Sequence, residues 1–407
     1  MKIIKTYQFK LKPTKAHVQT FERWLGVCRM VYNMALEIKI ETYKKRGISV
    51  SKWELQKQIT DIRKDYDWVR EVQVHTVQDV TDRLFRAYNN FFSRVKEKKK
   101  GKKIKAGYPK FAKKKRYCSF GFKGNEAKLH QSTCTVSLPK IGKVKYKKSQ
   151  EVCGEIKHTN IIKKADGWYV SITVEKEHIP LPTGSKTTGV DLGLTTFATT
   201  ASGKITNPKI LYKNQKKLRI AQRAVERKKL GGNNREKSVH RLQLIHQKIS
   251  NTRKDFLHKV SSKLISENQV IGIETLNIRG MMKNHHLAKA IADAGWGTLV
   301  SMLKYKGAWN ERTVCQAKQF YPSSKQCNLC GWKLECLPLS VREWACPNCN
   351  AVHDRDENAE NNLNKMAVGH TVSALRASEK SDGHCCASVP MATSKASAIS
   401  QRIPNHL

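Results

Sequence analysis

The chain is 407 residues long, a length that suggests roughly two to four domains with a sizeable core. It carries 77 lysines and arginines against 33 aspartates and glutamates, a formal net charge of +44. Such a charge destabilises a compact protein by self-repulsion unless a polyanion neutralises it, so nucleic acid is the expected partner and a membrane surface the weaker alternative.

No apolar run reaches the roughly 18 to 20 residues that cross a bilayer. The opening MKIIKTYQFKLKPT places lysines where a signal peptide needs its apolar centre. The 12 cysteines include two close pairs, which indicates reduced thiols and a metal site and not a disulfide framework. We therefore expect a cytoplasmic protein, nucleoid-associated through DNA, that is monomeric and has no membrane partner.

The first predicted element is a strand in residues 1–14, where IIKTYQFKLKPT alternates apolar and polar residues and ends in a turn. Residues 15–96 are expected to form a helical block, because apolar side chains recur there at three- and four-residue steps. Residues 97–184 open with a basic stretch and continue as short β patterns broken by glycine, asparagine and aspartate. This region suits a small antiparallel β-barrel or sheet, completed by the first strand.

The basic stretch RVKEKKKGKKIKAGYPKFAKKKRYCSFGF carries five aromatic residues among its lysines: Tyr108, Phe111, Tyr117, Phe120 and Phe122. Aromatic rings can stack on bases while lysines contact phosphates. We therefore favour contact with nucleic acid at this segment over a charged face that is only solvated.

Strands alternate with helices over residues 185–368, the pattern of an α/β domain. A buried strand pair in TTGVDLGLTTFATTASGKIT precedes a helical hairpin that GGNN at 231–234 interrupts. NQVIGIETLN is expected to be a further buried strand, AGWGTLVSMLKYKGAW a helix and RTVCQAKQFYP another strand. Residues 369–407 are rich in serine and alanine with few large apolar residues, so we expect a disordered tail.

Two Cys-x-x-Cys pairs, Cys327 with Cys330 and Cys346 with Cys349, are separated by fifteen residues. Each two-residue gap lets a pair converge on one tetrahedral ion, and the spacing between pairs suits a zinc ribbon. Cys336 lies between the pairs at a poorer spacing. Four thiolates leave no open coordination position, so the predicted Zn²⁺ is structural and not catalytic.

Acidic residues at three places suggest a second, harder metal. Phosphodiester hydrolysis commonly uses Mg²⁺, which requires carboxylates to hold it. Asp191 stands in GVDLG inside an otherwise apolar strand, Glu274 follows buried residues in VIGIETLN, and HDRDEN follows the second cysteine pair. Their joint order on an α/β domain of high positive charge favours a nuclease.

Each signal alone has a simpler interpretation. Asp191 could be a polar strand end, or belong to a phosphate-binding D-x-G loop of an actin-like ATPase. Glu274 could be an exposed glutamate at a strand end. The acids of HDRDEN could stand at a helix N-terminus, where they meet the helix dipole favourably.

Six segments are distinctive when they occur together: GVDLGLTTFAT, IGIETLNI, AGWGTLVSMLKYKGAW, YPSSKQCNLCG, CPNC and HDRDENAENNLN. They resemble the motifs of the TnpB family, transposon-encoded RNA-guided DNA endonucleases related to type V CRISPR effectors. The similarity extends to VYN and NFFSRVK near the N-terminus, so it covers nearly the whole chain except the tail.

The resemblance implies an α/β RuvC-like nuclease domain of ribonuclease H fold in residues 185–320 and 351–368, with a zinc ribbon inserted at 321–350. It also implies that the N-terminal β-barrel and the helical recognition block hold guide RNA paired with target DNA and read a short motif beside the target.

The resemblance further implies that Asp191, Glu274 and Asp356 are catalytic and bind Mg²⁺. Small residues usually follow the third acid in the family where this chain has Glu360. Spacing alone would not choose between Asp354 and Asp356, and the resemblance chooses Asp356.

A helix starting near Glu357 would let Asp356 project toward the sheet while Asp354 caps the helix or stays solvated. His353 and Arg355 either contact phosphate or the acids, or lie exposed on the surface.

The expected function is RNA-guided, Mg²⁺-dependent cleavage of target DNA next to a short target-adjacent motif, with guide RNA and target DNA as partners. Two alternatives remain open: a nuclease-inactive RNA-guided DNA-binding protein or repressor, and a transposase that transfers DNA strands.

Overall fold

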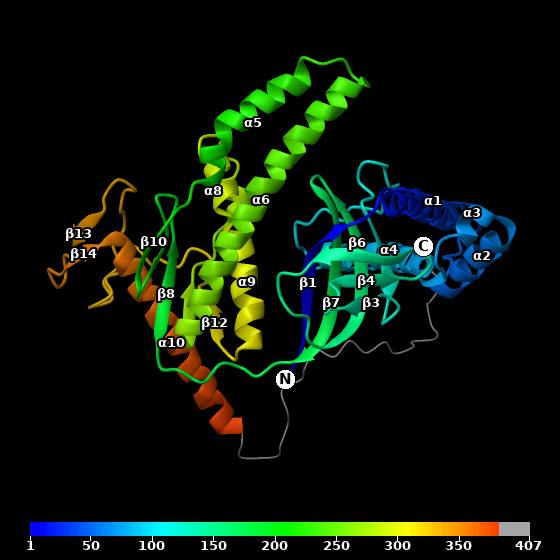
Figure 1. Ribbon diagram of the computed structural model, residues 1–407. Coiled ribbons are helices and arrows are strands. Elements are labelled where there is room, and N and C mark those ends of the chain that lie inside the picture. Colours follow the sequence, from blue (N-terminus) through cyan, green and yellow to red (C-terminus); the bar gives the residue numbers. More distant parts are fainter. Residues whose placement is uncertain (382–407) are drawn as a thin grey trace. The chain divides into compact units, whose positions relative to one another are not determined.

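The computed structural model describes residues 1–381, and its contacts divide the chain into two compact units, each considered by itself (Figure 1). The first unit comprises Met1–Pro182 and Lys209–His258, and the second comprises Thr183–Pro208 and the chain from Lys259 onward. Among the described residues, no helix has both the length and the apolar character needed to cross a membrane.

The first unit contains a seven-stranded antiparallel sheet of order β2-β6-β7-β1-β5-β4-β3. Its strands are β1 (Lys2–Lys12), β2 (Ser119–Lys123), β3 (Lys128–His130), β4 (Thr135–Leu138), β5 (Gly142–Lys147), β6 (Glu155–Lys164) and β7 (Gly167–Glu177). The first strand pairs with β7 on one side and β5 on the other, so it completes this sheet as expected. The order begins at β2 and ends at β3 without joining them, so hydrogen bonds leave the sheet open and not closed as a barrel.

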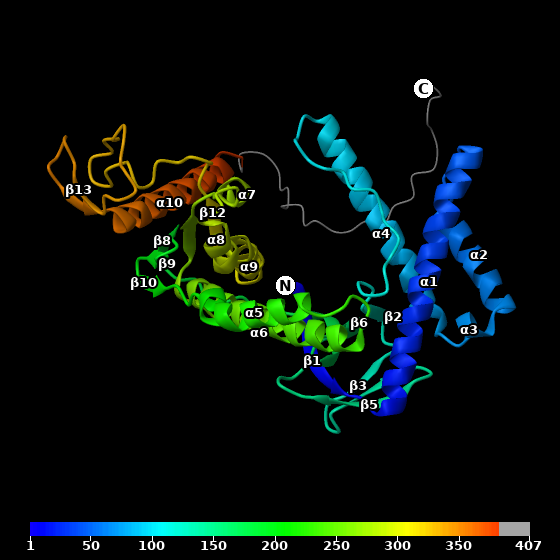
Figure 2. The ribbon, with the colours of Figure 1, turned by 90° about the horizontal axis from the view of Figure 1, so that it is seen from above.

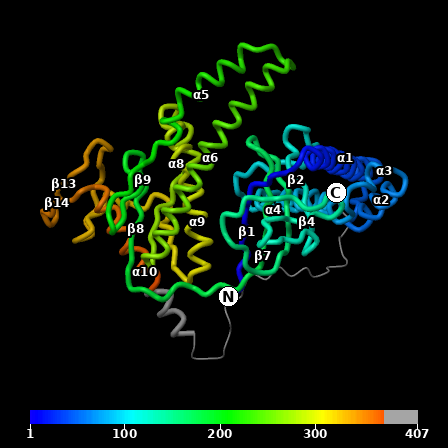
Figure 3. Tube along the Cα trace, viewed as in Figure 1, coloured from blue at the N-terminus to red at the C-terminus, as the bar shows by residue number. Residues whose placement is uncertain are grey.

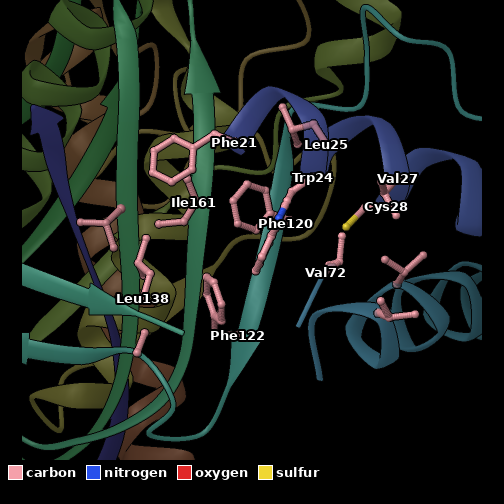
Figure 4. Close-up of a cluster of buried hydrophobic side chains, with 14 of the residues drawn as sticks. Phe21, Trp24, Leu25, Val27, Cys28, Val72, Phe120, Phe122, Leu138 and Ile161 are labelled. Atoms are coloured by element: carbon pink, nitrogen blue, oxygen red, sulfur yellow. The ribbon is translucent and has the colours of Figure 1, made fainter. Parts of the chain in front are cut away.

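Four helices follow β1: α1 (Lys15–Arg46), α2 (Lys52–Asp65), α3 (Asp67–Arg70) and α4 (Val74–Lys99). Thr14 and Ser51 begin α1 and α2 with capping boxes, in which each side chain accepts from a backbone N–H of the first turn. The apolar face of α1 packs on the sheet, where the Trp24 and Phe120 rings lie 5.6 Å apart (Figure 4). Helices and sheet therefore share one core.

Two aromatic residues of the basic segment belong to this core. Phe120 and Phe122 lie on β2 with 1% and 0% of their surfaces exposed, so the expectation that they stack on bases is wrong. Tyr117 packs against the core through its ring, while Tyr108 and Phe111 keep about half of their surfaces exposed, at 47% and 53%. Only these last two rings remain open to a partner.

The predicted helical hairpin consists of α5 (Ile210–Glu226) and α6 (Asn233–Glu267), which Figure 3 follows through its turn. His240 on α6 lies 2.7 Å from the Ala165 carbonyl, and Asp166 hydrogen-bonds with Gln247. These contacts with the turn between β6 and β7 place Lys209–His258 with the first unit. The sequence had grouped this segment with residues 185–320.

The second unit is an α/β domain built on a mixed five-stranded sheet of order β10-β9-β8-β11-β12. Its strands are β8 (Thr187–Leu192), β9 (Thr196–Thr200), β10 (Gly203–Thr206), β11 (Val270–Ile273) and β12 (Thr313–Gln316). Strands β8, β11 and β12 are parallel, whereas β9 pairs antiparallel with β8, and β10 pairs antiparallel with β9. The predicted α/β class is what the structure contains.

Helices cover both faces of this sheet: α10 (Arg355–Ser381) lies on one face and α9 (Trp296–Trp309) on the other (Figure 2). Two short helices, α7 (Ile278–Met281) and α8 (Ala288–Ala294), lead to α9. A small hairpin of β13 (Glu343–Ala345) and β14 (Val352–Asp354) precedes α10. A disordered tail was expected in residues 369–407, but α10 continues to Ser381, so the prediction is wrong up to that residue. Residues 382–407 lie outside the described residues.

Candidate functional site

The four predicted zinc cysteines come together. The sulfur atoms of Cys327, Cys330, Cys346 and Cys349 all lie within 4.8 Å of one another. The Cys327–Cys349 sulfur separation is 3.7 Å and the Cys330–Cys346 separation is 3.5 Å. A tetrahedral ion with Zn–S bonds of about 2.3 Å places its sulfurs about 3.8 Å apart, so the cluster fits Zn²⁺. Cys336 is exposed and is not part of this cluster.

Each cysteine pair forms the same tight turn. Four residues after the first cysteine of each pair, Gly331 and Asn350 have positive φ angles of 79° and 58°. Their backbone N–H groups donate to the carbonyls of Cys327 and Cys346. Glycine and asparagine tolerate this left-handed conformation, which bends both sulfurs of a pair toward one point. The turn chemistry and the cysteine spacing therefore support the same site.

His353 lies behind the cysteine cluster and not on the surface. It is 7% exposed, its ring packs on Trp344, and its Nε2 is 3.0 Å from the Cys327 sulfur. Both interpretations from the sequence, contact with phosphate or the acids and surface exposure, are therefore wrong for this residue. A histidine N–H beside a metal-ligating sulfur orients that ligand and stabilises its negative charge.

The first two acids stand side by side on neighbouring parallel strands. Strand β8 pairs with β11 so that Gly189 is opposite Gly272 and Val190 is opposite Ile273. Asp191 is the next residue of β8, and Glu274 directly follows the last residue of β11. Side chains of extended backbone alternate faces with a period of two. Both acids therefore project from the sheet face that the two glycines occupy.

That face is the one that α10 covers. A Cβ atom placed on Gly189 would lie 2.0 Å from the Glu360 carbonyl oxygen, and one on Gly272 would lie 2.2 Å from that of Leu363. Only glycine lets the helix backbone approach so closely. The helix that bears Asp356 is thereby seated directly above the strands that bear Asp191 and Glu274.

The pKa values of these acids also reflect neighbouring carboxylates. Burial raises the pKa of Asp191, and the neighbouring Asp356 carboxylate raises it further. Burial also raises the pKa of Glu274, with a further contribution from Asp191, although the Leu192 N–H donates to Glu274 at 3.1 Å. Carboxyl groups held where ionisation is unfavourable gain from a nearby cation. The arrangement is thus suited to binding a hard metal ion.

The two aspartates at the start of α10, Asp354 and Asp356, make different contacts. Asp354 caps the helix, because its Oδ1 accepts from the backbone N–H groups of Asp356 at 2.9 Å and Glu357 at 3.0 Å. This capping role confirms one of the two predicted for Asp354, while the helix begins at Arg355 and so slightly earlier than expected. Asp356 pairs instead with Arg342 of the cysteine-bearing segment, Nη1 to Oδ1 3.3 Å.

Arg355 does not contact the acids directly. Its Nη1 donates to the Pro338 carbonyl at 2.7 Å, so it braces the loop between the cysteine pairs. Its positive charge nevertheless favours the ionised form of Asp191.

Two asparagines of α10 join the helix to the cysteine-bearing segment. Asn358 accepts from the Asn328 N–H at 2.9 Å and donates to the Gln326 carbonyl at 2.8 Å. Asn362, one turn later, donates to the same carbonyl and to that of Ser323. Both side chains are buried. This clamp was not predicted from the sequence, although an Asn pair at four-residue spacing beside a metal motif is a signal that could have indicated it.

Glu360 is also structural. It is 5% exposed, and its Oε1 accepts from the Gly189 N–H at 2.8 Å and the Thr188 hydroxyl at 3.3 Å. The carboxyl thus ties α10 to β8 two residues before Asp191. Burial raises its pKa. This hydrogen bond explains why the chain has a glutamate where the family usually has a small residue.

A basic cavity of about 680 Å³ lies within the first unit. Six cationic side chains line it: Arg29, Lys114, Lys115, Lys163, Lys164 and Arg235. Two of these lysines come from the basic segment singled out in the sequence. Clustered cations beside a cavity are the arrangement that recognises phosphate groups of a nucleic acid.

Fold and site define an α/β protein with buried acids beneath α10 and an adjoining cluster of four cysteine sulfurs. Three family profiles match it: "Probable transposase" over residues 170–285, "Cas12f1-like, TNB domain" over 296–363 and "Helix-turn-helix domain" over 1–47. The second profile covers the cysteine cluster and the acids of α10.

Curated relatives match almost the whole chain. A protein of Streptomyces pristinaespiralis named "Putative RNA-guided DNA endonuclease" is 33% identical over 380 residues, covering 91% of this chain and 90% of that protein. InsQ of Escherichia coli K12, which bears the same description, is 28% identical and covers 92% of this chain and 94% of its own length. The chain therefore belongs to the TnpB (IS605 OrfB) family.

Among solved structures, the chain is similar to one titled "Structure of the mini-RNA-guided endonuclease CRISPR-Cas_phi3". The identity is 11%, the TM-score is 0.45, and the match covers 90% of this chain and 92% of that one.

Proposed function

We propose that this protein is an RNA-guided DNA endonuclease of a transposable element, which cuts target DNA next to a short adjacent motif by metal-dependent hydrolysis. The observation that supports the proposal is the burial of Asp191 and Glu274 on one face of the second unit's sheet, beneath the helix that carries Asp356. Membership of a family whose curated relatives bear the name RNA-guided DNA endonuclease agrees with it.

Carboxylates are the type of ligand that Mg²⁺ takes. This ion takes oxygen ligands, and the raised pKa of Asp191 and of Glu274 reflects negative charge that burial leaves without compensation. When bound, the metal supplies an activated water and stabilises the charge on the leaving oxygen. We propose that all three residues are ligands and are the catalytic residues of the protein.

The chain itself supplies the geometry. The Leu192 N–H orients one Glu274 oxygen, Asp354 holds the first turn of α10, and Glu360 ties that helix to β8. Arg342 balances the charge of Asp356. Because each carboxylate is held by a separate element, the cluster depends on the packing of the whole domain.

The fold type proposed for the second unit is a RuvC-like ribonuclease H fold with an inserted zinc ribbon. The sheet order supports it, since three consecutive antiparallel strands, β8 to β10, adjoin two parallel strands, β11 and β12, that follow later in the chain. The zinc ribbon would be structural, because four thiolates would fill all four coordination positions of a bound Zn²⁺.

Guide RNA and target DNA are the proposed partners. A net charge of +44 and the basic cavity of the first unit suit a polyanion. In this mode of recognition, base pairing reads sequence while the protein contacts backbone and duplex shape. The open sheet and helical block of the first unit would form the proposed recognition module.

The test is to purify the protein, sequence the RNA that accompanies it, and offer DNA matching that RNA in Mg²⁺ with varied flanking sequences. Cleavage that requires both RNA match and Mg²⁺ supports the proposal. RNA-guided binding without cleavage would favour a repressor, and joining of transposon ends without RNA would favour a transposase.

A further inference from the structure

A small cavity lies beside Glu274, between the chain that leaves β11 and the chain that leaves β12. Its volume is about 240 Å³, below the roughly 300 to 1,000 Å³ usual for drug- or cofactor-sized ligands. Apolar and aromatic side chains make up much of its lining: Leu276, Met281, Ala317, Phe320 and Tyr321. These features suit one planar group, such as a nucleobase, directly beside a candidate catalytic acid.

The walls of the cavity are fixed by hydrogen bonds. The Thr275 hydroxyl donates to the Ala317 carbonyl at 2.6 Å, and the Ala317 N–H donates to the Ile273 carbonyl at 2.8 Å. Together they join the segments after β11 and β12. A preformed cavity of this kind loses little conformational freedom when a ligand enters.

Phe320 occupies an unusual position on the rim. The Tyr321 N–H donates to the Lys318 carbonyl at 3.0 Å, which makes Phe320 the third residue of a four-residue turn. Its φ angle is 65°, a conformation for which turns use glycine or asparagine. Its side chain is 87% exposed. Neither backbone preference nor burial therefore accounts for a phenylalanine here.

An exposed ring held in an unfavourable backbone conformation points to an external contact. We propose that Phe320 stacks on a base of the DNA strand being cut, at the nucleotide beside the phosphate on which the acids act. This inference rests on the proposed endonuclease function. The cavity shares Glu274 with the carboxylate cluster, so a strand that reaches the acids passes the ring.

Lys318 supports the same ligand. It is exposed on the same turn and lines the same cavity, where its ammonium group can contact a backbone phosphate while the ring contacts the base. Every base presents a π face, so stacking tolerates any sequence. Such a contact suits an enzyme whose choice of sequence lies in its guide.

The experiment places 2-aminopurine, a base analogue whose fluorescence falls on stacking, at successive positions around the cut site of a guide-matched target. The RNA-loaded protein carries Asp356→Asn to prevent cleavage. Phe320→Asn removes the ring and keeps a residue suited to the left-handed backbone, Phe320→Trp keeps an aromatic ring, and Leu339→Asn removes another exposed apolar side chain.

We expect quenching at one or two positions next to the cut, which Phe320→Asn abolishes and Phe320→Trp retains. In the cleavage-competent background, Phe320→Asn should slow single-turnover cleavage by roughly 5- to 150-fold, the range that base–aromatic stacking supplies. Binding of the guided target should change little, because base pairing provides it. Leu339→Asn should behave as the unsubstituted protein.

Equal fluorescence with and without the Phe320 ring at all positions would overturn the proposal. So would a melting temperature that falls with Phe320→Asn, since that would show that the ring packs within the protein. Cleavage by the unsubstituted protein reports on the proposed function and the fluorescence reports on Phe320, so the two can fail separately.

Discussion

Gly189 and Gly272 lie opposite each other on two parallel strands, and the backbone of α10 crosses both where side chains would otherwise stand. Asp191 follows the first glycine by two residues and Glu274 follows the second by two. Because α10 also carries Asp356, this glycine pair sets how closely the third acid approaches the other two.

Replacing Gly189 with alanine should therefore lift α10 from the sheet. A Cβ atom 2.0 Å from the Glu360 carbonyl cannot be accommodated without movement, and overpacking of this kind destabilises by about 1–3 kcal/mol. We expect a lower melting temperature and slower single-turnover cleavage, with guided DNA binding less affected. Gly184→Ala is the matched control, because no atom lies within 4 Å of its Cβ position. Equal behaviour of the two variants would show that the close approach of α10 to the sheet does not depend on glycine at position 189.

The asparagine clamp should couple the zinc ribbon to the acids. Asn358→Ala with Asn362→Ala leaves the Asn328 N–H and the Gln326 carbonyl without these partners. We expect cleavage to fall by about 10- to 100-fold, as when supporting shells of metal sites are removed, while zinc stays bound. Asn361→Ala, at an exposed position of the same helix, is the control. Unchanged cleavage in the double variant would show that the clamp does not position Asp356.

Loss of a zinc ligand should have a wider effect. Cys346 is fully buried in the ribbon's small core with Leu337 and Trp344, and structural zinc sites contribute directly to folding. Cys346→Ser should lower the zinc content measured by elemental analysis, expose the ribbon to proteolysis and abolish cleavage. Cys336→Ser should do none of these. Full cleavage by a zinc-free Cys346→Ser protein would refute a structural metal.

The raised pKa values predict how pH acts on the metal-free protein. Burial and, to a smaller extent, repulsion by neighbouring carboxylates raise the pKa of Asp191 to about 7 and that of Glu274 to about 8, against about 4 in unfolded chains. Between these values the folded state binds more protons than the unfolded state, so stability falls as pH rises. The stability of Asp191→Asn relative to the unsubstituted protein should therefore increase between about pH 4 and pH 8.

Asp166 provides a control of opposite sign for the pH experiment. Burial raises its pKa, but hydrogen bonds from Tyr169 and Lys10 outweigh burial and bring the pKa to about 2. Its contribution should be lost only in acid, so Asp166→Asn should show no relative change above about pH 5. Chemical denaturation at fixed ionic strength measures both. A flat profile for Asp191→Asn would contradict the buried, mutually repelling acids.

The contact of the Glu360 carboxyl, which joins α10 to β8, can be tested separately. Glu360→Ala leaves the Gly189 N–H without its side-chain acceptor, and an unsatisfied buried donor destabilises by about 1–3 kcal/mol. Glu360→Gln retains an oxygen acceptor and should recover most of that loss. Denaturation curves compare the two variants, and equal destabilisation would show that charge, and not the hydrogen bond, matters at this position.

Local chemistry explains what the sequence could predict. The cysteine spacing predicted the sulfur cluster because both turns form within a few residues, and Gly331 and Asn350 supply the conformation required. The strands that bear Asp191 and Glu274 were recognisable as apolar runs. Their pairing, and so the meeting of the acids, depends on a register that no local pattern encodes.

The sequence-based predictions were wrong where residues distant in the sequence determine whether a side chain is buried. Phe120 and Phe122 stand among lysines and resemble a base-stacking surface, yet Trp24 and Phe21 of α1 bury them. The period-two pattern of SFGF was a signal for a strand with one face in a core. The place of His353, expected either at phosphate or the acids or on the surface, was likewise missed because its partners, Cys327 and Trp344, are brought to it only by the fold of this segment.

The most direct test of the central claim compares two neighbouring acids. Asp356→Asn and Asp354→Asn each remove one charge at the start of α10, but asparagine still caps a helix well. In single-turnover cleavage of a guide-matched target with Mg²⁺, we predict a loss of at least about 100-fold for Asp356→Asn and a nearly unchanged rate for Asp354→Asn. Full activity of Asp356→Asn, or loss only with Asp354→Asn, would contradict the assignment of the carboxylate cluster.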